Sequence, residues 1–108
     1  MKKKTDFDYM PVNIQCRCLA VKAGMIANEI FMIEDTPPYD GRMVASKYRA
    51  IDRLAKRIFE LSGVPVDKLA SVLYNVGGTW GQYFNGLRAL GVPIADYEEY
   101  LKYTGGIE

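Results

Sequence analysis

Residues 69–86 decide the fold that we expect for this chain, and they read LASVLYNVGGTWGQYFNG. The stretch predicts two short helices joined by a turn. Thr79 and Gln82 have the spacing of a capping box, in which each side chain bonds the main-chain amide of the other residue. We therefore expect the second helix to begin at Trp80, and the pair Asn85-Gly86 predicts its end after roughly two turns.

A longer helix is predicted before this pair, over residues 42–61. Its apolar residues recur at the helical spacing of three and four, as a helix with one buried face requires. Gly63 is expected to end it in the left-handed conformation, and Pro65 to open the next helix. Beyond the pair, Pro93 predicts the start of a last helix that runs to about residue 103.

Residues 12–33 fit two interpretations. Val12, Ile14 and Cys16 alternate with polar residues, as in a half-buried strand. The same stretch also keeps apolar residues three and four apart and is rich in alanine, which favours a helix. A helix is the preferred interpretation, and a β-hairpin turning at Ala23-Gly24 is the alternative.

The length of 108 residues predicts one compact unit. Within it we expect an N-terminal extension with a proline-containing loop over residues 1–41, and a helix-turn-helix domain over residues 42–108. No run reaches the roughly 18 apolar residues of a membrane span. The charged start is followed by polar residues instead of the apolar run of a signal peptide, so a cytoplasmic protein without a membrane partner is expected.

The residue inventory argues against metal, cofactor and enzyme chemistry. Cys16 and Cys18 are the only cysteines and there is no histidine, so a four-coordinate zinc site cannot be completed. The sequence contains no nucleophile motif, phosphate loop or acid-base pair at a recognisable spacing. We expect no catalytic residue, no metal, no cofactor and no enzyme activity.

Charge is distributed unevenly, although the net charge is only +1. Between residues 42 and 57 six basic residues stand against the single acid Asp52, and residues 68–95 contain no acid. The middle of the chain is therefore its electropositive part, which is compatible with an anionic partner.

Residues 51–102 resemble the lambda-repressor-like, or XRE, helix-turn-helix family. The resemblance is most specific at Ser62-Gly63-Val64, at Leu69-Ala70 and at FNGLRAL, residues 84–90. It implies a mostly α fold, namely a five-helix DNA-binding domain preceded by the N-terminal extension. The family position that matches Trp80 is apolar and packed inward, so Trp80 is expected in the core.

The resemblance also implies a function, that of a sequence-specific DNA-binding transcriptional regulator. A small phage-type or bacterial repressor acting as a homodimer on double-stranded DNA is expected, with residues 77–86 in the major groove. Gln82 would pair with adenine, Asn85 would contact phosphate, and Arg88, in the loop after the helix, would reach the groove or the backbone. The expected DNA-binding residues are Lys68, Gly77, Gly78, Thr79, Gln82, Asn85 and Arg88.

Departures from the family pattern support a second interpretation. Gly77 and Gly78 stand where side chains normally read bases, and Val66 replaces a polar residue that commonly binds phosphate. The alternative is a protein-binding module on the same fold, antitoxin-like or a phage-encoded inhibitor, that has lost or reduced DNA readout. Residues 12–33 would then contact a protein partner.

Overall fold

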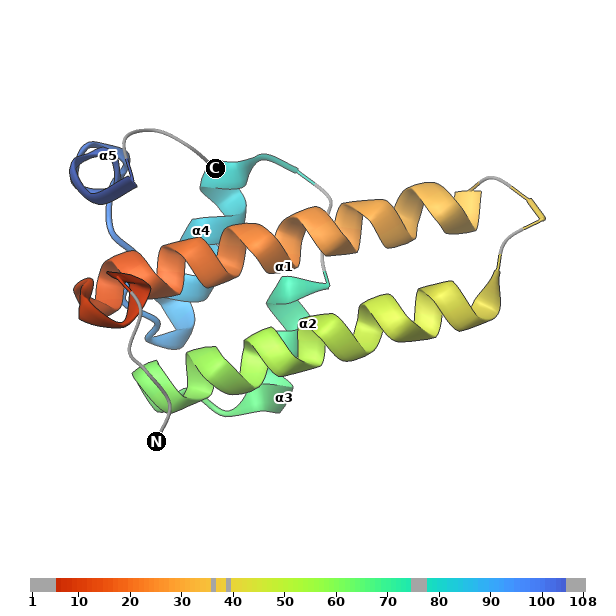
Figure 1. The fold of residues 1–108 in the computed structure, drawn as a ribbon, viewed down its shortest axis with the longest axis horizontal. Coiled ribbons are helices and arrows are strands. Elements are labelled where there is room, and N and C mark those ends of the chain that lie inside the picture. Colours follow the sequence, from red (N-terminus) through yellow and green to blue (C-terminus); the bar gives the residue numbers. More distant parts are fainter. Residues whose placement is uncertain (1–5, 36, 39, 75–77, 105–108) are drawn as a thin grey trace.

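The computed structural model describes residues 6–35, 37–38, 40–74 and 78–104, and these residues form a short 3-10 helix and five α-helices (Figure 1). Their bounds are η1 (Asp6–Tyr9), α1 (Val12–Asp35), α2 (Gly41–Ser62), α3 (Val66–Leu73), α4 (Trp80–Leu90) and α5 (Tyr97–Thr104). The described residues contain no strand. The mostly α class is therefore confirmed, as is the helix over residues 12–33, and the β-hairpin alternative is wrong.

The two long helices α1 and α2 lie side by side and run in opposite directions (Figure 1). The shorter helices α3 and α4 lie behind this hairpin in the same view, and α5 lies beside the N-terminal half of α1. Two long antiparallel helices therefore form one layer, against which the predicted helix-turn-helix pair packs.

Helix α1 contributes more to the core than any other element. Eleven of its residues are buried, against four in α2. Apolar and small residues occupy most sides of α1 between Ile14 and Ile30, and a helix that is apolar on most sides is stable only when neighbours surround it. One cluster of buried side chains joins α1 to α2, α3 and α4. The segment expected as an extension is thus the helix around which the others pack.

The ends of α2 follow the local signals in the sequence. Asp40 caps its first turn, because its carboxylate accepts a hydrogen bond of 2.9 Å from the amide of Arg42. Gly63 ends the helix with a φ of 80°, as predicted, and its amide donates to the carbonyl of Phe59. Helix α3 then begins at Val66, directly after Pro65.

The predicted end of α4 at Asn85-Gly86 is wrong, because the helix continues to Leu90. Leu87, the residue directly after this pair, is fully buried, so the burial of the apolar face outweighs the local stop signal. The helix ends instead at Gly91, whose φ of 106° is one that residues with a Cβ rarely adopt.

The predicted start of the last helix at Pro93 is also wrong. Residues 92–96 are irregular, and α5 begins at Tyr97. The carboxylate of Asp96 accepts a hydrogen bond of 2.8 Å from the amide of Glu99, which is the bond that an N-cap residue makes. Ile94 and Ala95 are buried before this cap, so the irregular segment between α4 and α5 packs into the core.

Helices α1 and α4 approach closely at Gly24. A Cβ atom at this position would lie 2.9 Å from ring atoms of Trp80, so the indole ring occupies the space above the glycine. The ring also stacks on Phe84, with centroids 5.7 Å apart. Trp80 nevertheless keeps 48 % of its surface exposed, so the prediction that it lies in the core is wrong. It covers the outside of the α1–α4 contact.

A buried arginine beside Phe84 contacts three elements. Arg17 of α1 is only 7 % exposed, and its Nη1 donates a hydrogen bond of 2.8 Å to the carbonyl of Ala95. Its guanidinium carbon lies 4.4 Å from the ring centroid of Phe84 and 4.9 Å from that of Tyr100. Cation–π attraction and the hydrogen bond thus hold α4 and α5 against α1. The Nε of Arg17 is buried without a hydrogen-bond partner among the described residues.

Replacing Arg17 with alanine should destabilise the fold by about 2 to 4 kcal/mol, because the change removes a buried hydrogen bond and two ring contacts and leaves a cavity. Urea denaturation measures the loss. Lys22→Ala, at an exposed position of α1, is the matched control and should change the free energy of unfolding by less than about 0.5 kcal/mol. Equal stability of the two variants would contradict the role given to Arg17.

Candidate nucleic-acid interface

The residues expected to bind DNA are solvent-exposed wherever the structure describes them, and Gly77 lies outside the described residues. The six described residues are Lys68, Gly78, Thr79, Gln82, Asn85 and Arg88. Gln82, Asn85 and Arg88 are three residues apart and share one face of α4, whereas Lys68 belongs to α3. Thr79 and Gly78 lie next to Gln82 at the start of α4, so the structure brings together all of the described set except Lys68.

The capping box at the start of α4 is confirmed. The amide of Gln82 donates to Thr79 Oγ1 at 3.2 Å, and the amide of Thr79 donates to Gln82 Oε1 at 3.0 Å. A bidentate pair with adenine would require Gln82 Oε1 to accept from the base while Nε2 donates to it. Because Oε1 already accepts the capping hydrogen bond from the amide of Thr79, the expected pair with adenine would compete with that bond.

Arg88 is engaged within the fold as well. It lies in the last turn of α4, so its expected place in a loop is wrong. Its Nε and Nη2 each donate to the carbonyl of Ile94 at 3.3 Å, and its Nη1 donates to Asn85 Oδ1 at 3.0 Å. The guanidinium therefore fixes the segment after α4 against the helix and also occupies the side chain of Asn85. Both expected contacts with DNA would require these bonds to be exchanged.

The outer face of α2 carries cations that have no such internal partners. Arg42, Arg49, Arg53 and Lys56 are exposed, and none forms an ion pair with another described residue. At 100° per residue these four positions point away from the buried face of the helix, which carries Ile51. We call Arg42, Arg49, Arg53 and Lys56 the basic stripe.

The other two cations of α2 are neutralised within the molecule. Lys47 pairs with Glu29 of α1, and Arg57 donates to Asp8 of η1 at 2.9 Å. Asp52 flanks the basic stripe, and its carboxylate accepts a short hydrogen bond from the hydroxyl of Tyr74. Tertiary ion pairs thus neutralise Lys47 and Arg57, which face α1 and η1. The cations that face solvent stay unpaired among the described residues.

The dimensions of the basic stripe suit an extended polyanion. Arg42 and Lys56 are separated by about 21 Å along the helix axis at 1.5 Å per residue. A duplex of that length carries about a dozen phosphate charges. Three of the four cations are arginines, whose planar guanidinium can bond two phosphate oxygens at once.

None of the six basic residues of 42–57 was among the DNA-binding residues expected from the sequence. A helical wheel of α2 would have placed the four stripe residues on one face. The partners of Lys47 and Arg57 lie 18 and 49 residues away in the chain, so no local pattern separates the paired cations from the unpaired ones.

The described part of the chain contains no group of three or more histidine, cysteine, aspartate or glutamate side chains placed to hold a metal ion. None of its helices is both long enough and apolar enough to cross a membrane.

Comparison with models of protein families, with curated proteins and with solved structures gave no match to this chain. The resemblance to the XRE helix-turn-helix family therefore stays a prediction.

Removal of the capping hydroxyl by Thr79→Ala should lower the free energy of unfolding by about 1 kcal/mol, because the amide of Gln82 loses its acceptor at the start of α4. Thr79→Ser keeps the hydroxyl and should retain nearly all of the stability. Urea denaturation of the two variants gives the comparison. A serine variant as unstable as the alanine variant would show that the methyl group of Thr79, and not the capping bond, matters.

Proposed function

We propose that the protein binds double-stranded DNA and acts as a transcriptional regulator, with the basic stripe of α2 in contact with the phosphate backbone. One observation supports this proposal above all, namely four cations on one helix face that have no acidic partner among the described residues. Phosphate contacts provide the sequence-independent part of DNA affinity, and exposed arginine and lysine side chains make them.

Sequence readout by α4 is a separate part of the proposal. Figure 1 shows α4 crossing behind α1, whereas α2 lies beside α1, so the two surfaces belong to different layers of the molecule. A duplex that contacts the basic stripe does not by itself require α4. With Oε1 of Gln82 accepting in the cap, pairing with adenine requires Oε1 to accept a second hydrogen bond or to give up the first. Repression by a homodimer that inserts α4 into the major groove depends on this second contact.

The salt dependence of DNA binding tests the basic stripe. Fluorescence anisotropy with a labelled duplex of about two turns should give a log Kd that rises with log salt concentration with a slope of about 3 to 4, as expected for four phosphate contacts. Arg49→Gln combined with Arg53→Gln should lower that slope by about two. The matched control is Lys22→Gln with Lys102→Gln, which changes the net charge equally at exposed sites on α1 and α5. Equal weakening by the control pair, or no binding at about 50 mM salt, would contradict the proposal.

One further variant in the same assay separates the two surfaces. Gln82→Glu replaces the amide oxygen with a carboxylate oxygen that can still accept from the amide of Thr79, as in the common form of the capping box, and adds a negative charge at the start of α4. DNA binding should fall strongly if α4 enters the groove and should remain close to wild type if only the basic stripe contacts the duplex.

Protein binding is the second candidate function, and one observation favours it. Met25, Phe31 and Met32 of α1 are 50 %, 57 % and 63 % exposed, so the end of the central helix presents an apolar surface to solvent. Phe31→Ser with Met32→Ser should leave duplex binding unchanged if DNA is the partner, because neither residue belongs to the basic stripe. Loss of a stable protein partner from this variant, with duplex binding absent from the wild type, would favour the second candidate.

A further inference from the structure

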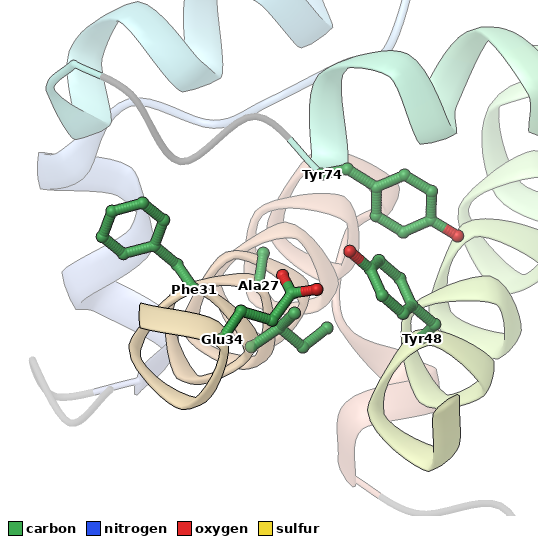
Figure 2. A pocket seen from close by; sticks show the side chains of 6 residues that line it. Ala27, Phe31, Glu34, Tyr48 and Tyr74 are labelled. Carbon is green, nitrogen blue, oxygen red and sulfur yellow. The ribbon is translucent and has the colours of Figure 1, made fainter. Parts of the chain in front are cut away.

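A small pocket lies where the C-terminal half of α1 meets α2 and the end of α3. Its volume is about 90 Å³, and Figure 2 shows the side chains around it. The lining residues are Ala27, Ile30, Phe31, Glu34, Tyr48 and Tyr74. A water molecule occupies about 30 Å³ of the liquid, so the pocket accepts a group of a few heavy atoms and excludes a nucleotide or a folded segment.

Two tyrosines form one wall of this pocket. The rings of Tyr48 and Tyr74 stand edge to face, with centroids 5.2 Å apart and planes at 89°. The hydroxyl of Tyr74 donates to the carboxylate of Asp52, which holds that ring in place. Burial first, and then the carboxylate of Asp52, raise the pKa of Tyr74 to about 12, so its phenol stays neutral over the physiological range. The wall is therefore aromatic, uncharged and fixed in orientation.

The opposite side of the pocket carries a negative charge without a positive partner. Figure 2 shows the side chain of Glu34 extending over the floor toward the side where the two tyrosines stand. Glu34 forms no ion pair with another described residue, and no arginine or lysine is among the lining side chains. Ala27 and Ile30 supply an apolar floor. An aromatic wall, a carboxylate and an apolar floor thus surround one small space.

These three features together select for a cation that has an alkyl chain. Aromatic faces attract ammonium groups through the ring quadrupole, and a carboxylate adds direct charge attraction. An apolar floor favours the methylene groups next to the charge, as for the stem of a lysine side chain. An anion would be repelled by Glu34, and a neutral ligand of the same size would gain only the apolar contact.

We propose that this pocket binds an alkylammonium group, either as a free small amine or as a lysine side chain of a polypeptide. The proposal does not rest on DNA binding, because none of the side chains that line the pocket belongs to the basic stripe. Failure of one proposal therefore leaves the other standing.

The test is an NMR titration of the full chain with n-butylammonium, with 1-butanol as the neutral ligand of the same length. Butylammonium should produce saturable shifts of the Tyr48 and Tyr74 ring resonances with a millimolar Kd, and butanol should bind at least about fivefold more weakly. Equal shifts by the two ligands would overturn the proposal, because they would show an apolar pocket without cation preference.

Two variants locate the interaction. Glu34→Gln should weaken butylammonium binding about fivefold or more, whereas Glu98→Gln, which removes the same charge from α5, should leave it unchanged. Tyr48→Phe keeps the ring and should bind like the wild type, which excludes a requirement for the hydroxyl. Unchanged binding by the Glu34 variant, or equal weakening by the Glu98 variant, would overturn the assignment.

A third ligand distinguishes the two sources of the ammonium group. A short peptide with one central lysine should bind at least tenfold more tightly than butylammonium if the natural occupant is a polypeptide, since neighbouring residues then add contacts. Equal affinities would assign the pocket to free amines. Failure of both ligands to bind would refute the proposal.

Discussion

The burial of α1 is the constraint on which the rest of the structure depends. This helix packs against α2 along its length, contacts α3 and α5, and accepts the Trp80 ring of α4 over Gly24. The hydroxyl of Tyr83 adds a hydrogen bond of 2.8 Å to the carbonyl of Ala20, which ties α4 to the same helix. Helices α3 and α4 share one cluster of buried side chains with α1 and α2, and Tyr100 of α5 packs with Ile14 of α1, so none of the short helices has a core of its own. Arg17 extends this dependence to α5, whose Tyr100 it contacts through the ring face.

Local signals predicted those parts of the fold that local chemistry determines. The ends of α2, the start of α4 and the capping box of Thr79 and Gln82 all depend on residues within a few positions of each other, and all were predicted correctly. The end of α4 and the start of α5 were not, because burial of Leu87 and of Ile94 decides them. Sequence alone could not predict the contacts of Arg17, since its partners lie 67 or more residues away and a polar position near the start of α1 predicts exposure.

The candidate DNA site illustrates the same division between local and tertiary effects. Gln82, Asn85 and Arg88 share a face as the resemblance implied, yet each makes hydrogen bonds that serve the helix ends. On α2, tertiary ion pairs neutralise Lys47 and Arg57, whereas the cations of the basic stripe form no ion pair with a described residue. Affinity for an anionic partner is thus better supported on α2 than on α4. The pocket beside Tyr48 contains a negative charge instead, the carboxylate of Glu34.

The folding of a fragment that begins at residue 41 tests most directly the claim that α1 is the centre of the fold. Circular dichroism and urea denaturation of residues 41–108 should show low helix content and no cooperative transition, because α2 would lose its main partner and the core shared with α3 and α4 would lose the side chains of α1. Addition of a peptide with residues 6–35 should restore helix content and cooperativity. A cooperative transition in the fragment alone, with native helix content, would contradict the central role of α1 and would identify residues 41–108 as an independent domain.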